Sequence, residues 1–199
     1  MPNFTFNPEG HIYKVDGNQW PSVTSVLPYN YKGDNTYAMQ KGTYVHDTCK
    51  LYLLNDLDEE SLDPVLVPYL DALKKFLHDS KGMGIEGLFD LKSGSPHPCA
   101  ELQISAYIEL VNNGIPLPVH IGDITTNMFL ELPFYHPIHQ YAGTPDIIIG
   151  KRPIKEGYAL YLKSTGKYAL EPIKNIRKNL ETFLCFLRAE KWKREKGLI

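Results

Sequence analysis

Apolar and polar residues follow two periods along this chain, and together they predict a mixture of strands and helices. Alternation over Phe4–Phe6 and His11–Val15, with a turn between them, predicts an N-terminal β-hairpin. A helical period predicts amphipathic helices over Thr36–Asn55, Val65–His78 and Ala100–Leu110. The pattern therefore favours an α/β fold in which a central mixed β-sheet is flanked by helices.

The remaining apolar runs are short and predict the strands of that sheet. Gly87–Lys92 predicts a buried strand that ends at a Ser-Gly turn, and Met128–Tyr135 and Tyr141–Gly150 predict two more strands. The His-Pro turn between these last two strands places His136 and His139 at the surface. The end of the chain predicts a second hairpin, with Ser-Thr-Gly at its turn, and then a long helix.

Length and composition predict one cytoplasmic domain. A chain of 199 residues that is 43% apolar can bury a sizeable core, so we expect a single domain. No window is apolar enough to span a membrane, and the N-terminus resembles no secretion signal. Three cysteines without a CxxC pair do not suggest a disulfide framework or a zinc site. The expected parts are a hairpin and loop over 1–35, a core over 36–156, and a hairpin with a basic helix over 157–199.

Charge is unevenly distributed along the chain. The net charge is -2, yet the residues from Lys151 onward include 13 Lys and Arg against 5 Asp and Glu. A basic C-terminal part suits contact with a nucleic-acid backbone, although basic helix ends are also common on solvated surfaces. Tyr29, Tyr31 and Lys32, in a loop rich in Tyr, Asn and Gly, offer stacking and charge for the same kind of partner, or simply packing.

The strand over Gly87–Lys92 carries the most suggestive chemistry. Asp90 and Lys92 are two residues apart, so strand alternation points both side chains to the same face. A carboxylate can bind a divalent metal, and a nearby ammonium can stabilise charge on a phosphate. The helix that follows places Gln103 and Tyr107 one turn apart, where both can face back toward the strand end.

These residues resemble a known family. DLKSG followed by ELQISAYIEL resembles the core of the PD-(D/E)XK nuclease superfamily, in its RecB-like and phage-exonuclease branch. Three further stretches are similar to motifs of that family: GTYVHDTCKLYL from Gly42, YAGTPDIII from Tyr141 and PSVTSVL from Pro21. LYLKSTGK also repeats DLKSG superficially, but Tyr161 stands where the carboxylate belongs. We therefore take Lys92, and not Lys163, as the candidate lysine.

The resemblance implies a restriction-endonuclease-like core that uses Mg²⁺ or Mn²⁺. It implies catalytic roles for Asp90, Lys92 and Asp146, and less directly for Glu131, whose position in an apolar strand calls for a metal or a partner. The implied metal ligands are Asp146, Asp90, the carbonyl of Leu91, and His46. Substrate contacts are expected from Gln103, Tyr107, Lys50 and Ser93.

One departure concerns the order of the motifs. In the family the strand with the GxxD aspartate precedes the DxK strand, whereas here Asp146 follows Asp90 and the Gln103 helix lies between them. A metal site depends on geometry and not on chain order, so a rearranged core can still assemble the site. It can equally leave the site unassembled.

The expected function is therefore a metal-dependent DNA nuclease in a bacterial or phage-infected cell, acting in recombination, repair or phage DNA processing. Exonuclease is preferred because the histidine-bearing helix resembles the end-processing branch, and a structure-specific endonuclease is the nearest alternative. A non-catalytic DNA-binding module and an interaction protein are the alternatives from other classes. DNA is the expected partner; a homo-oligomer and a single-strand-binding or annealing protein remain open.

Overall fold

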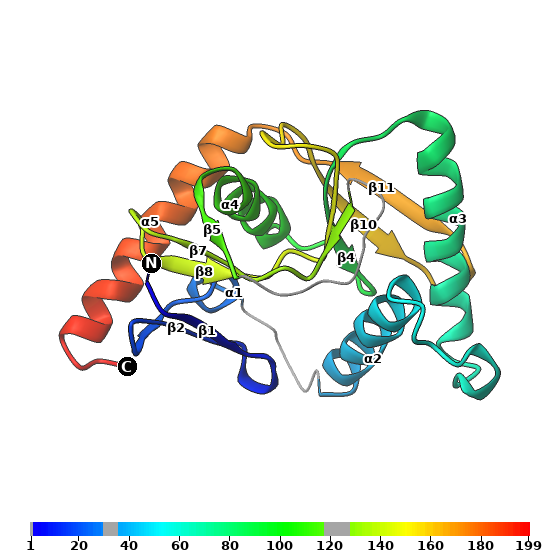
Figure 1. Cartoon of the computed structure of the whole chain (residues 1–199), viewed down its shortest axis with the longest axis horizontal. Coiled ribbons are helices and arrows are strands. Elements are labelled where there is room, and N and C mark those ends of the chain that lie inside the picture. Colours follow the sequence, from blue (N-terminus) through cyan, green and yellow to red (C-terminus); the bar gives the residue numbers. More distant parts are fainter. Residues whose placement is uncertain (1, 30–35, 118–127) are drawn as a thin grey trace.

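The protein has a mixed α/β fold, as the sequence predicts. The computed structural model describes residues 2–29, 36–117 and 128–199. Within these residues there are five α-helices and three β-sheets (Figure 1). None of the described helices combines the length and apolarity needed to cross a membrane.

A five-stranded mixed sheet forms the centre. Its strands lie in the order β11-β10-β4-β9-β6. The central strand, β4, runs parallel to β10 and antiparallel to β9. The bounds are β4 (Gly87–Lys92), β6 (Met128–Leu130), β9 (Ile147–Ile149), β10 (Gly157–Leu162) and β11 (Tyr168–Pro172).

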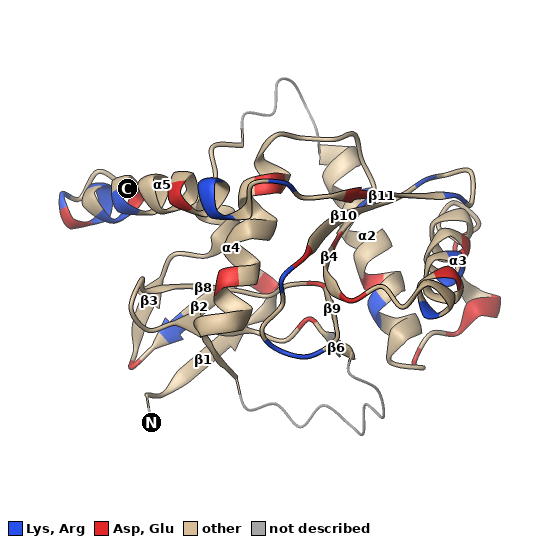
Figure 2. Ribbon diagram, turned by 90° about the horizontal axis from the view of Figure 1, so that it is seen from above, with Lys and Arg blue, Asp and Glu red and all other residues tan. Residues whose placement is uncertain are grey.

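Helices cover both faces of this sheet (Figure 1). Strand alternation divides β4 between the two sides, because Leu88 packs into the core under α4 and α5, whereas Phe89 and Leu91 pack into the core under α2 and α3. Asp90, like Leu88, therefore belongs to the α4 side. The helices are α2 (Thr36–Leu53), α3 (Val67–Met83), α4 (Cys99–Asn113) and α5 (Ile176–Glu195), and Lys and Arg recur along the C-terminal half of α5 (Figure 2).

The N-terminal part forms a separate small sheet. The predicted hairpin is present as β1 (Phe4–Asn7) and β2 (Ile12–Val15), and β3 (Asn18–Trp20) extends it. Ser22 caps the short helix α1 (Val23–Val26) by accepting a hydrogen bond from the backbone N–H of Ser25. The hairpin packs on a third sheet through a cluster that includes Phe4, Tyr13, Tyr135 and Ala142.

Two predicted strands are each broken in the structure. Met128–Tyr135 divides into β6 and β7 (Phe134–His136), and Tyr141–Gly150 divides into β8 (Tyr141–Gly143) and β9. The breaks contain Pro133 and Pro145, which cannot donate to a strand ladder, and Glu131 adopts a positive φ of 40°. As a result β7 and β8 pair with β5 (Ile115–Pro116) in a third sheet, and only β6 and β9 of these two segments join the central sheet. Short 3-10 helices lie at Pro8–Gly10 and Glu59–Ser61.

Candidate active site

The end of β4 brings the predicted acid and amine together. Asp90 is 1% exposed, and its Oδ2 lies 2.6 Å from Nζ of Lys92. Both side chains leave the strand on the same face because two residues separate them. The predicted Asp-x-Lys pair is therefore an ion pair near the C-terminal end of β4. We call this end of the sheet, where β4 and its neighbours terminate, the sheet edge.

Asp146 lies beside this pair although it is distant in the sequence. In the antiparallel register of β4 and β9, Leu88 is opposite Ile148 and Phe89 is opposite Ile147, so the next position along places Asp146 opposite Asp90. Oδ2 of Asp146 accepts a hydrogen bond from the backbone N–H of Leu91 at 2.6 Å. The two aspartates are thus neighbours even though their motifs occur in the rearranged order.

Glu131 completes a row of three carboxylates. It follows β6 directly, and its backbone N–H donates to the carbonyl of Asp146 at 3.0 Å. The Glu131 side chain is 27% exposed, so it is not the buried strand carboxylate that the apolar pattern suggested. Glu131, Asp146 and Asp90 therefore lie at the ends of three adjacent strands, β6, β9 and β4, on one edge of the sheet.

Helix α2 presents a histidine and a lysine to this row. Nδ1 of His46 lies 3.7 Å from Oδ1 of Asp146, and Nζ of Lys50 lies 2.6 Å from Oε2 of Glu131. The two residues share a helix face because they are one turn apart. Each carboxylate of the row thus has its own cationic or ionisable partner, including Lys92 for Asp90.

Gln103 ties α4 to the ion pair. Its Nε2 donates to Oδ1 of Asp90 at 3.2 Å, and its Oε1 accepts from Nζ of Lys92 at 3.1 Å and from the hydroxyl of Tyr29 at 2.7 Å. The amide therefore orients both charged groups, and Tyr29 serves this network. Tyr31 and Lys32 lie outside the described residues.

Tyr107 and Ser93 are placed differently from each other. Tyr107 is 5% exposed, and a Cβ added at Gly143 would lie 2.7 Å from its ring, so the glycine makes room for the tyrosine. Ser93 is half-buried just after β4, and its Oγ lies 3.5 Å from where a Cβ would stand at Gly42 of α2. Tyr107 is therefore part of the core beside the site, whereas Ser93 lies between the end of β4 and α2.

The ionisable groups of the site change one another's pKa values. Burial raises the pKa of Asp90, and Lys92 offsets only part of this effect. Burial alone would lower the pKa of Lys92, but the charge of Asp90 raises it above its ordinary value. Burial would likewise raise the pKa of Asp146, yet His46, Lys92 and the Leu91 N–H together lower it. Lys92 is therefore an ammonium at neutral pH.

His46 follows the same logic. Burial would lower its pKa, but the interaction with Asp146 and the charge of Asp90 together raise it. The histidine therefore binds a proton more readily in the folded protein than in a free peptide, because Asp146 stabilises its protonated form.

One residue close to the row escaped the sequence analysis. The hydroxyl of Tyr13, on β2, lies 2.8 Å from Oγ1 of Thr144, two residues before Asp146. Burial raises the pKa of Tyr13 to about 12, and the charges of Glu131 and Asp146 contribute to the increase. No local pattern signals this contact, because it depends on how the N-terminal sheet docks on the third sheet.

The carboxylate oxygens of this site are of the kind that bind a hard cation, but they are too far apart in this structure to bind one together. Oδ2 of Asp90 is buried and accepts no hydrogen bond of good geometry from the described residues, but Nζ of Lys92 lies 2.6 Å away, so this oxygen could bind a further ligand only if the ammonium moved. However, Asp90, Asp146, Glu131 and His46 supply no three ligand atoms within 4.8 Å of one another. A divalent ion would therefore require Lys92 or Lys50 to withdraw and the carboxylates to converge.

A second titratable group lies elsewhere, at α4 and the β7–β8 turn. Glu109, His136 and His139 are the one set of three such residues in the described chain whose ligand atoms lie within 4.8 Å. His136 is 1% exposed, so its prediction as a surface residue is wrong. Its Nδ1 accepts from the backbone N–H of His139 at 3.1 Å, so Nε2 carries the proton toward Glu109 Oε1 at 3.3 Å. This tautomer closes the turn and leaves neither ring nitrogen free for a metal.

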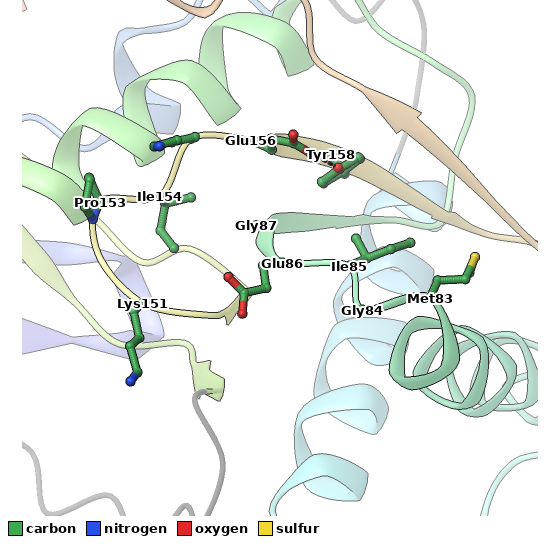
Figure 3. Close-up of a pocket in the computed structure, with 11 residues that line it drawn as sticks. Met83, Gly84, Ile85, Glu86, Gly87, Lys151, Pro153, Ile154, Glu156 and Tyr158 are labelled. Carbon is green, nitrogen blue, oxygen red and sulfur yellow. Dashed lines mark hydrogen bonds between the residues drawn. The ribbon is translucent and has the colours of Figure 1, made fainter.

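A cavity of about 630 Å³ lies at the opposite end of β4 from Lys92. Residues before β4 and in the segment before β10 line it, among them Glu86, Lys151 and Glu156 (Figure 3). No predicted site residue lines it, so we place the candidate chemistry at the strand end, where the carboxylates meet.

No protein-family model, curated protein or solved structure matches this chain. The likeness to PD-(D/E)XK nucleases therefore depends on the quoted residues and on their arrangement.

Proposed function

We propose that this protein is a metal-dependent DNA nuclease, with an exonuclease as the preferred form, built on a restriction-endonuclease-like core. The observation that supports the proposal best is the meeting of Asp90, Lys92 and Asp146 at one sheet edge. Asp146 and Leu91 are joined by a hydrogen bond across 55 residues of sequence. A rearranged motif order that nevertheless juxtaposes the three side chains favours a reaction centre over a chance match.

The carboxylates would hold one or two Mg²⁺ or Mn²⁺ ions. Asp90 and Asp146 are the principal ligands, with Glu131 and the Leu91 carbonyl as additional oxygen donors. When bound, such an ion supplies Lewis acidity toward the scissile phosphate and lowers the pKa of a bound water. His46 would help to hold Asp146 in place, as it does through the 3.7 Å contact.

Lys92 would stabilise charge and not act as a base. Because Asp90 raises the pKa of Lys92, the side chain carries a proton at neutral pH. An ammonium aimed at the site can neutralise the charge that develops on a phosphate during hydrolysis. Gln103 fixes the position of the ammonium through its Oε1.

A non-catalytic DNA-binding module is the second candidate. It is favoured by the spacing of the carboxylates, which do not converge on one point. Lys178, Arg188 and Lys193 of α5 form no ion pair among the described residues, so they are available for phosphate contact in either case. The two candidates differ only in whether bound DNA is cleaved.

The test is digestion of an end-labelled linear duplex and a closed circular plasmid, each with Mg²⁺, Mn²⁺ or EDTA. Wild type is compared with Asp90→Asn, which preserves side-chain shape, and with Asp56→Ala as a control at an exposed loop position. We expect metal-dependent loss of the linear DNA by wild type and Asp56→Ala, and at least a hundredfold slower loss by Asp90→Asn. Plasmid nicking would indicate an endonuclease. Binding without cleavage by folded wild type would favour the DNA-binding module.

A further inference from the structure

The tip of the β10–β11 hairpin lies at the same sheet edge as the candidate active site. Strand β10 runs parallel to β4 with Tyr161 opposite Lys92, so both strands end at this edge. Lys163 lies two residues beyond Tyr161 and therefore faces the same side of the sheet as Lys92. The dimensions of a β-sheet place the Cα atoms of Lys163 and Lys92 about 8 Å apart.

A second lysine lies directly across the hairpin. Leu162 pairs with Tyr168, and the next pair is Lys163 with Lys167, whose backbones are joined by a hydrogen bond from Lys163 N to Lys167 O at 2.9 Å. Both side chains are exposed, and neither has an ion-pair or hydrogen-bond partner for its ammonium among the described residues. Like charges on opposite strand positions destabilise a hairpin, and an anion between them removes that cost.

The hairpin tip has a defined backbone. Gly166 adopts a φ of +70°, and its N–H donates to the carbonyl of Lys163 at 3.1 Å, which closes the turn. A Cβ at Gly166 would lie 3.8 Å from Cβ of Asp71, so the tip lies against α3. Asp71 forms no ion pair with either lysine among the described residues. The two ammonium groups therefore project from a fixed turn.

Charge is segregated along this edge of the sheet. From β6 through β9 to β4 the strand ends carry Glu131, Asp146 and Asp90, whereas from β4 through β10 to β11 they carry Lys92, Lys163 and Lys167. Carboxylates hold cations and ammonium groups hold phosphates. A phosphodiester strand that crosses the edge would meet the basic half next to the reaction centre.

We propose that Lys163 and Lys167 form a phosphate subsite that holds the nucleic-acid backbone next to the reaction centre. This inference rests on the proposed nuclease function, since it assigns the lysines to the substrate strand of the same site. Lys163 is not an alternative to Lys92, because the residue before it on the same face is Tyr161 and not a carboxylate. Its expected contribution is to binding and not to turnover.

The first experiment measures binding without cleavage. Fluorescence anisotropy of a labelled single-stranded oligonucleotide is recorded with the full chain in EDTA and in Ca²⁺, over a range of salt concentrations. The double variant Lys163→Ala with Lys167→Ala is compared with Lys151→Ala plus Lys155→Ala, which removes the same charge from exposed positions at the far end of β4. We expect about tenfold weaker binding and a salt slope smaller by about 1 to 2 for the hairpin variant alone.

The second experiment separates binding from chemistry. With Mg²⁺, the hairpin variant should raise KM by about tenfold and change kcat by less than about twofold. Arginine at both positions should restore KM, because it retains the positive charge. Normal stability of the variant, measured by thermal unfolding, shows that the fold is intact.

Each outcome decides the inference. Equal affinity for wild type and the hairpin variant overturns the subsite, as does an equal loss in the far-end control, which would indicate only general charge. If wild type cleaves DNA and the hairpin variant has the same affinity and KM, the subsite is overturned and the proposed nuclease function stands. If only the hairpin variant loses affinity and wild type does not cleave DNA, the subsite is supported and the nuclease function is rejected. Absence of salt-dependent binding by wild type rejects both.

Discussion

Two groups of titratable side chains lie near opposite ends of α4. They differ in how many of their polar atoms have hydrogen-bond partners within the protein. At the sheet edge, Oδ2 of Asp90 is buried without a well-formed hydrogen bond, and its charge is balanced by Lys92. In the β7–β8 turn, both ring nitrogens of His136 have partners within the fold. The first group therefore has a buried carboxylate oxygen held only by a lysine, whereas the central histidine of the second group has no ring nitrogen left for a ligand.

The compactness of a cluster is therefore a poor guide to its function. Glu109, His136 and His139 are closer together than the carboxylates of the candidate site. Yet hydrogen bonds from Asn113 to Glu109 at 2.9 Å and from Lys191 to the carbonyl of His139 at 2.7 Å bind this group into the structure. A buried histidine with both nitrogens in hydrogen bonds favours a structural role, and a buried carboxylate held chiefly by one lysine favours a functional one.

The largest expected effect is on the rate of DNA cleavage, when Lys92 of the first group is replaced. Lys92→Ala removes the ammonium that stabilises charge at the phosphate, so cleavage in Mg²⁺ should fall by about a hundredfold to a thousandfold. DNA binding, measured by anisotropy, should change by less than about threefold because other cations remain.

Lys155→Ala is the matched control, since Lys155 is exposed at the far end of β4. Unchanged turnover in Lys92→Ala would remove the reaction centre from the strand end.

Replacing His136 should affect stability and leave chemistry unchanged. His136→Ala deletes a buried ring and its hydrogen bonds to Glu109 and the His139 N–H, which should cost about 3 kcal/mol of unfolding free energy in urea titrations. Turnover per folded molecule should remain at the wild-type level.

His139→Ala serves as a comparison, because that side chain is only half-buried, and about 1 kcal/mol is expected. If Zn²⁺ raised the Tm of wild type but not of His136→Ala, the group would be a metal centre and the contrast between the two groups would fail.

The smallest expected difference between the two groups is in how the free energy of unfolding depends on pH. The folded pKa of His46 is raised, chiefly by Asp146 acting against burial, so its stabilising effect is full below about pH 6.5 and is lost as pH rises through the folded pKa. The folded pKa of His136 is lowered by burial, so stability falls as pH drops through about 6.5.

Urea titrations in EDTA between about pH 5 and 8 would test this difference. The stability deficit of His46→Gln relative to wild type should shrink as pH rises, whereas the deficit of His136→Gln should shrink as pH falls. Two deficits that change in the same direction would contradict the assignment of environments.

The sequence predicted the parts of the site that local pattern controls. Alternation in Gly87–Lys92 predicted that Asp90 and Lys92 share a face, and helical spacing predicted that Gln103 faces back toward them; both are confirmed. The position of Asp146 came only from a family resemblance, since the spacing of residues along a chain does not specify which strands pair. Whether these groups form a nuclease site remains a prediction.

What the sequence determined by itself was the identity of the elements: the strand that ends in Asp90 and Lys92, the helices around it, and the C-terminal hairpin with its basic helix. Only the tertiary structure decided which strand ends are neighbours. The register between β4 and β9 places Asp146 beside Asp90, and the breaks near Glu131 and Pro145 send β7 and β8 into another sheet, where His136 is buried. The reason is physical: alternation and helical period are set by adjacent residues, whereas pairing between distant strands is set by the packing of the whole core.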